Sequence, residues 1–138
     1  MSKRPFVIFA IVLVTLAVLV PLWAFGADGD SENRSGDLPA GLEEGQTLFE
    51  TNCGVCHSLY AAGTDGNFGP ALDLLLAPSG APTGPTAQQT IEATETRVLN
   101  AIENGVDSTT PGRMPPGILA GEQARQVAEY VGYVAGRG

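Results

Sequence analysis

Hydrophobic positions divide the chain into an apolar start, a polar stretch without periodicity, and a longer region with helical patterns. Residues 6–25 (FVIFAIVLVTLAVLVPLWAF) form an almost unbroken apolar run behind the basic residues Lys3 and Arg4. As a helix that rises 1.5 Å per residue, this run spans about 30 Å, the thickness of the hydrocarbon core of a bilayer. The pattern predicts a single N-terminal transmembrane helix, with residues 1–27 as the anchor.

The competing interpretation of residues 1–27 is a cleaved secretory signal. Ala24 and Gly26 are small residues of the kind that a signal peptidase accepts. The apolar run is longer than the ~7–15 residues usual in such signals, which favours the anchor. In both cases the positive charge ahead of the run places the N-terminus in the cytoplasm and the rest of the chain on the periplasmic or extracytoplasmic side of the cell membrane.

The polar stretch that follows has the composition of a linker. Residues 28–41 (DGDSENRSGDLPAG) are rich in Gly, Ser, Asp and Asn and show no apolar period. Such sequences behave as solvated, flexible tethers. We therefore predict a flexible acidic linker over residues 28–41 and one folded domain over residues 42–138.

Helical spacing dominates the domain, so the expected fold class is all-α. Three patterns carry it: Leu42, Leu48 and Phe49; Val98, Leu99 and Ile102, with Gly105 as a left-handed stop after Asn104; and Ala124, Val127, Ala128, Val131 and Val134, beginning near Gly121. Ala77 to Gln89 are rich in Pro, Gly, Thr and Ala and predict a surface loop. A domain this small, with so much of it in loops, has little helix area for a core, so we expect a cofactor, metal or disulfide to complete it.

Charge narrows the range of partners. All fifteen acidic residues follow position 27, together with only five of the seven basic ones. Phosphate binding needs clustered Lys or Arg, so the composition excludes nucleic acid as a partner. The acidity is compatible with two roles, solubility of an exported domain and attraction of a basic docking partner.

The chain places both of its cysteines and its one histidine within five positions, as Cys53, Cys56 and His57. A thioredoxin-like redox pair would need a preceding strand, and no strand pattern precedes Cys53. A structural zinc site needs four ligands, which this chain cannot supply from cysteine and histidine alone. A disulfide is chemically allowed in an exported domain but leaves His57 without a role.

Covalent haem attachment uses all three residues. In Cys-x-x-Cys-His the two sulfurs add to the vinyl groups of the porphyrin, and the histidine binds the iron. The iron ligands that proteins place opposite a histidine are mainly methionine or a second histidine. Met114 is the one methionine besides Met1. We therefore predict one heme c per chain with His57 and Met114 as ligands to iron; the alternative for Met114 is a thioether that only packs in a loop.

These stretches resemble the class I c-type cytochromes, specifically the membrane-anchored bacterial type with one haem. The resemblance rests on residues 45–57 (GQTLFETNCGVCH), 69–72 (GPAL), 101–105 (AIENG), 113–117 (RMPPG) and 127–134 (VAEYVGYV). It implies a cytochrome c fold of three or more helices around one haem. It also implies that the Pro70 carbonyl accepts the His57 ring N–H, and that Tyr130 packs on the first domain helix near Gly45.

The domain departs from the familiar mitochondrial members, because it has neither a lysine patch nor a tryptophan. The groups that hold the haem propionates are therefore open, with Tyr60, Arg97 and Arg113 as candidates.

An iron with histidine on one face and methionine on the other has no free position for a substrate, so the expected function is electron transfer rather than catalysis. The expected carrier is tethered to the membrane and shuttles between a quinol-oxidising complex as donor and a terminal oxidase or similar acceptor. Two alternatives stay open. The chain is a fixed haem subunit of a larger respiratory or dehydrogenase complex, or a ligand-binding sensor or peroxidase-like domain with Met114 off the iron.

Overall fold

The computed structural model describes residues 4–26, 38–107 and 112–138; within the first helix it describes the side chains of Arg4 and residues 7–20. The chain separates into two compact units, residues 1–32 and 33–138. This division falls within the predicted 28–41 linker, of which residues 28–37 lie outside the described part of the chain. The domain bounds given by the sequence stay predictions.

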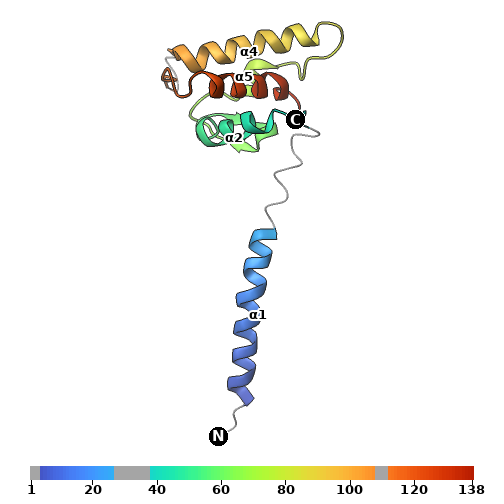
Figure 1. The fold of residues 1–138 in the computed structure, drawn as a ribbon, viewed down its shortest axis with the longest axis vertical. Helices are drawn as coiled ribbons and strands as arrows, with labels where there is room; N and C mark the ends of the chain where they lie inside the picture. The colour runs from blue at the N-terminus through green and yellow to red at the C-terminus, as the bar shows by residue number, and fades with distance from the viewer. Residues whose placement is uncertain (1–3, 27–37, 108–111) are drawn as a thin grey trace. The chain divides into compact units, whose positions relative to one another are not determined.

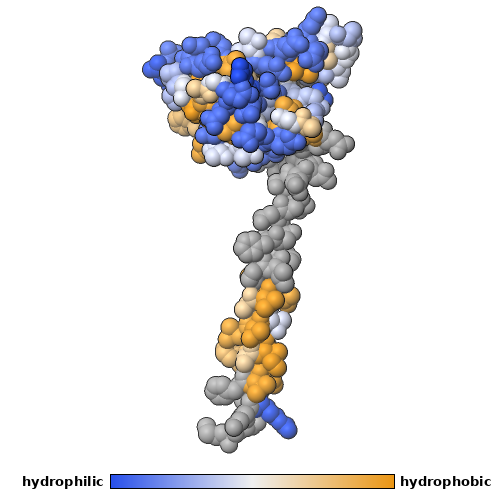
Figure 2. Space-filling view, in the orientation of Figure 1, coloured by the Kyte–Doolittle hydropathy of each residue, from blue (hydrophilic) through white to orange (hydrophobic). Residues whose placement is uncertain are grey.

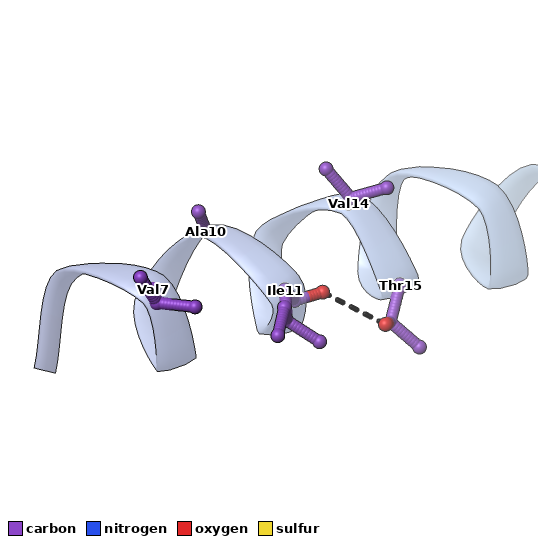
Figure 3. A pocket seen from close by; sticks show the side chains of 5 residues that line it. All are labelled: Val7, Ala10, Ile11, Val14 and Thr15. Carbon is purple, nitrogen blue, oxygen red and sulfur yellow. Dashed lines mark hydrogen bonds between the residues drawn. The ribbon is translucent and has the colours of Figure 1, made fainter. Parts of the chain in front are cut away.

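The described part of the first unit is helix α1, from Arg4 to Gly26 (Figure 1). Its described apolar side chains are exposed, and Figure 2 shows them gathered along the helix. The Thr15 hydroxyl donates a hydrogen bond of 2.8 Å to the Ile11 carbonyl, so the one polar side chain among residues 7–20 is satisfied within the helix (Figure 3). A shallow hollow on the same surface is lined by Val7, Ala10, Ile11, Val14 and Thr15 and contains no ionisable group (Figure 3).

The sequence predicts a transmembrane helix here. The predicted helix is present, since α1 runs for 23 residues. Over the residues that the structure describes, however, no helix combines the length and the apolar character needed to cross a membrane. The membrane span is therefore unsupported by the structure.

The second unit is mainly helical, as the all-α prediction requires (Figure 1). Its elements in chain order are α2 (Glu43–Asn52), β1 (Ser58–Leu59), the 3-10 turn η2 (Tyr60–Ala62), β2 (Thr64–Asp65), α3 (Leu72–Leu76), α4 (Ala87–Asn104) and α5 (Glu122–Val134). The two strands form one short antiparallel hairpin, in which Ser58 pairs with Asp65 and Leu59 with Thr64.

Helix α5 forms the centre of this unit and packs against both α2 and α4 (Figure 1). Its predicted apolar face is buried, and Tyr130 on the same helix is fully buried as well. The largest fully buried side chains are Tyr130, Phe49, Leu59, Val127, Val131 and Val134. Burying each of these stabilises the fold by about 1.5–3 kcal/mol, so this cluster fixes how the helices pack.

The α2–α5 crossing depends on Gly45. A Cβ atom on Gly45 would lie 2.2 Å from the Gln126 carbonyl oxygen and 2.8 Å from the Tyr130 Cβ. One turn further along α2, the Phe49 and Tyr130 rings lie with centroids 6.1 Å apart and planes at 50°. The expected packing of Tyr130 on the first domain helix near Gly45 is thus confirmed.

Two local predictions need correction. Helix α4 begins at Ala87, inside the predicted loop Ala77–Gln89. Its first turns are polar, and among them only Ile91 is buried, so they carry no apolar period. Gly105 does end α4 with a positive φ of 70°, but its ψ of 177° is extended rather than left-handed helical.

Candidate functional site

Helix α2 ends at the first cysteine of the motif. Cys53 is the C-cap residue of α2, and its N–H donates to the Phe49 carbonyl at 2.8 Å. Gly54 donates to the same carbonyl at 2.9 Å. Phe49 is buried in the core, and Cys53 is only 9% exposed, whereas Val55 within the motif is 77% exposed. The start of the motif is therefore fixed relative to the packed helices.

The motif folds into a single tight turn. The N–H groups of Cys56 and His57 both donate to the Cys53 carbonyl, at 3.0 and 2.9 Å. The turn therefore gathers two thiols and an imidazole at one place. Both cysteines are free thiols.

The chemistry of the first thiol argues against a redox pair. Burial, and secondarily the neighbouring Cys56, raises the pKa of the Cys53 thiol to about 11. Redox-active cysteines need the opposite shift, because the thiolate is the attacking species. A helix rather than a strand precedes the motif, which also disfavours the thioredoxin-like arrangement.

The His57 ring is oriented by the segment that precedes α3. Its Nδ1 lies 2.9 Å from the Pro70 carbonyl oxygen. A carbonyl only accepts, so Nδ1 carries the proton and donates, which leaves the Nε2 lone pair available to a metal. This is the hydrogen bond that the resemblance implied for Pro70. Such a partner fixes the ring and makes it a stronger donor to a metal.

Gly69 allows this arrangement. A Cβ on Gly69 would lie 2.5 Å from His57 Cε1 and 2.7 Å from Nδ1, so any side chain here would push the ring away. The Gly69 N–H also donates to the Cys56 carbonyl at 2.7 Å. The segment 69–70 thus holds the motif at two points, one on its backbone and one on its imidazole.

The β1–β2 hairpin supports the turn from another side. The Thr64 hydroxyl donates to the His57 carbonyl and accepts the Leu59 N–H, both at 3.0 Å. A Cβ on Gly66 would lie 2.6 Å from the His57 backbone nitrogen. The hairpin backbone therefore lies directly against the Cys56–His57 peptide.

Met114 reaches the domain core from the segment between α4 and α5. It is partly buried and packs against the apolar cluster that also contains Cys53. Its backbone pairs with Val106 in an isolated antiparallel bridge. The structure thus brings Cys53, Cys56, His57 and Pro70 together, whereas Met114 shares with them only its packing against the core cluster that contains Cys53. Their assignment to a haem stays a prediction.

Three residues are predicted as candidates to hold the haem propionates, Tyr60, Arg97 and Arg113. Tyr60 is 57% exposed, and Arg97 is exposed on α4. Arg113 forms an ion pair of 2.9 Å with Asp107. These contacts do not connect the three side chains with the Cys53–His57 turn, so their role in haem binding stays a prediction.

Sequence reasoning missed Gly69, Thr64 and Asp73. The Asp73 carboxylate accepts the N–H groups of Tyr60 at 2.9 Å and Gly136 at 2.8 Å, and so ties η2 and the C-terminal residues to α3. Gly69 precedes Pro70 in the sequence, so its position beside a predicted partner of His57 was a signal that could have identified it. Thr64 and Asp73 gave no signal, because their partners are backbone groups brought near by the fold.

The residues of the site fit a covalently attached haem. Two unpaired thiols and an imidazole with a free Nε2 share one turn, and Gly69 leaves room for the ring. Among the described residues, no group of three or more His, Cys, Asp or Glu side chains is placed to hold a bare metal ion. A porphyrin supplies four nitrogen ligands itself and needs only axial side chains from the protein.

Comparison with known protein families agrees with this site. The family model described as Cytochrome c matches residues 42–135, which include the whole motif and end one residue beyond α5. A comparison with curated proteins gives no match. The chain belongs to the cytochrome c family, whose members bind haem c covalently and transfer electrons.

Proposed function

We propose that this chain is a one-electron carrier whose haem c is attached through Cys53 and Cys56 and whose iron is held between His57 and Met114. The observation that carries the proposal is the His57 Nδ1 to Pro70 carbonyl contact of 2.9 Å beside two free thiols. It presents Nε2 as the ligand atom at the place where the porphyrin would be fixed. No other imidazole exists in the chain.

When bound, the haem supplies an iron that changes between its ferric and ferrous states. The protein contributes position and environment. Pro70 and Gly69 orient the His57 ring, and the Cys53–Cys56 turn fixes the attachment points. The apolar cluster around Phe49, Leu59 and Val131 provides a surrounding of low polarity, which favours the ferrous state and raises the reduction potential.

Met114 decides between electron transfer and ligand binding. If its thioether bound the haem iron, Met114 would leave no place there for a substrate, and the haem would then serve electron transfer alone. The partial burial of Met114 against the core supports this role, since a thioether on an exposed loop would have no fixed place from which to bind.

We further propose that α1 tethers the carrier to the cell membrane, with the haem domain outside the cytoplasm. The support comes from the apolar run and the basic residues ahead of it, and from the exposure of its described apolar side chains. A quinol-oxidising complex as donor and a terminal oxidase or similar acceptor fit a carrier with a high potential.

Absorption spectra test the ligation. The oxidised protein should show the charge-transfer band of sulfur bound to ferric iron, and Met114→Leu, which preserves side-chain volume, should abolish it. Leu74→Ala serves as control, because Leu74 is apolar but 74% exposed. Rapid binding of carbon monoxide by the reduced wild-type protein would refute the closed sixth position.

Extraction with acidified acetone tests the attachment. The pigment should remain with the wild-type polypeptide and should be released from a variant with Cys53→Ser and Cys56→Ser. Release from the wild-type protein would refute covalent attachment.

Deletion of residues 1–41 tests the tether. Electron flow in membranes should fall with this deletion and persist when only residues 28–37 are removed. Unchanged flow after the larger deletion would refute the tether. In mild detergent, a haem-stained band of the chain alone on native electrophoresis supports a free carrier, whereas comigration with a large complex supports the fixed subunit.

A further inference from the structure

The backbone of Met114 is held by two hydrogen bonds to Val106, the second residue after α4. The Val106 N–H donates to the Met114 carbonyl at 3.0 Å, and the Met114 N–H donates to the Val106 carbonyl at 3.1 Å. At the adjacent position, Arg113 Nε lies 2.9 Å from Asp107 Oδ1. A backbone pair and an ion pair at consecutive positions therefore connect residues 106–107 with residues 113–114.

Gly105 makes the pairing possible. Its φ of 70° and ψ of 177° lie in a region that is essentially restricted to glycine. A Cβ on Gly105 would lie 2.6 Å from the Met114 carbonyl oxygen and 2.8 Å from the Pro116 nitrogen. Both are backbone atoms, which cannot rotate aside as the end of a long side chain can. Any side chain at position 105 would therefore push the Met114 backbone away.

A further hydrogen bond fixes the chain after Met114. The Gly117 N–H donates to the Ile102 carbonyl at 2.8 Å, and Ile102 is fully inside the core cluster. Met114 thus pairs with Val106, two residues after α4, while Gly117, three residues beyond Met114, is bonded to Ile102 in the last turn of α4. The position of the Met114 backbone is set by the end of that helix.

We propose that Gly105 is a positioning residue for the Met114 thioether. By admitting the Val106–Met114 pairing, it fixes the backbone from which the sulfur reaches the iron. A ligand group that is already held in its bound position loses less conformational freedom on binding, so an added ligand competes with it less well. This inference rests on the proposed ligation of iron by Met114, and Gly105 itself touches no reacting atom.

Imidazole, which competes with methionine for ferric iron, is the probe. The full-length, haem-loaded protein is compared as wild type, Gly105→Ala and the control Gly121→Ala. Gly121 precedes α5, also has a positive φ, of 59°, and has nothing within 4 Å of an added Cβ. Both substitutions strain the backbone, but only the one at 105 places a Cβ against Met114.

In Gly105→Ala we expect imidazole affinity to rise by about tenfold or more, with a weaker sulfur-to-iron charge-transfer band, because the thioether is no longer preorganised. In Gly121→Ala the affinity should change by less than about twofold, because that strain lies away from Met114. Wild-type affinity and a wild-type band in Gly105→Ala would overturn the inference, as would equal changes in both variants.

Amide hydrogen exchange gives a measurement that needs no variant. In the wild-type ferric protein, the Val106 and Met114 amides should exchange at least about tenfold more slowly than free peptide, and saturating imidazole should accelerate both. Free-peptide rates for both amides would overturn the inference. If the wild-type protein lacks the charge-transfer band, the proposed ligation is wrong and this inference fails with it. If the wild-type protein has the band and Gly105→Ala keeps both its full intensity and the wild-type imidazole affinity, only the proposed role of Gly105 is refuted.

Discussion

Gly45→Ala should destabilise the domain although alanine is the better helix former. In an isolated helix this substitution stabilises by about 1 kcal/mol. At the α2–α5 crossing, however, the new methyl would lie 2.2 Å from the Gln126 carbonyl oxygen and 2.9 Å from the Gln126 carbonyl carbon. Ordinary contacts of this kind need well over 3 Å, so the two helices must separate by about 1 Å at a point where backbone meets backbone.

The magnitude follows from three contributions. Overpacking of a well-packed crossing costs about 1–3 kcal/mol. Separation of the helices also weakens the Phe49–Tyr130 pair, which is worth about 0.5–1.5 kcal/mol beyond its buried area. After subtraction of the gain in helix propensity, the free energy of unfolding should fall by about 1–3 kcal/mol. For a domain of about 100 residues this lowers Tm by roughly 5–15 °C.

Denaturant unfolding of the haem-loaded protein, followed by circular dichroism at the helix band, measures this loss. Gly132→Ala is the matched control. Gly132 also lies inside a helix at a crossing, but an added Cβ would meet Glu95 Cγ at 2.5 Å, an atom that rotation about χ1 can move, and backbone atoms only at 3.3 Å. Its unfolding free energy should stay within about 1 kcal/mol of wild type, because Glu95 can move aside. If Gly45→Ala proves as stable as wild type, the close approach of α2 and α5 is wrong.

Three further predictions concern polar groups. Burial, and then two neighbouring glutamates, raises the pKa of Glu95. The ionised carboxylate therefore destabilises the fold at pH values above its folded pKa, and this penalty disappears below about pH 4.5. Glu95→Gln should raise the unfolding free energy at pH 7 by about 0.2–0.5 kcal/mol and leave it unchanged at pH 4. A gain that persists at pH 4 would contradict this cause. Thr64→Val should lower the unfolding free energy by about 1–3 kcal/mol, because it leaves the His57 carbonyl and the Leu59 N–H without their partner, while Thr64→Ser should keep most of the stability. If the two variants are equally stable in thermal unfolding, the hydroxyl does not contribute to stability. Asp73→Asn should weaken the bond to the Gly136 N–H and speed exchange of that amide by about tenfold, and an unchanged exchange rate would show that the contact contributes nothing.

The candidate haem-attachment motif could be found in the sequence because its residues are neighbours in the chain. Cys53, Cys56 and His57 lie within five positions, so their spacing alone specifies one turn and three reactive groups. The burial of α5 was equally predictable, since a 3.6-residue period records which face of a helix is covered. The family and its helical fold follow from these local patterns.

What the tertiary structure decided depends on groups far apart in the chain. The Pro70 carbonyl meets His57 across thirteen positions, and Asp73 meets Gly136 across sixty-three. Thr64, Gly69 and Gly105 have their roles because the fold brings particular groups, many of them backbone atoms, against them. Such contacts cannot be predicted from the sequence, since every residue has the same backbone atoms. The start of α4 escaped prediction for a related reason: its first turns are mostly exposed, so tertiary contacts and not an apolar period determine where that helix begins.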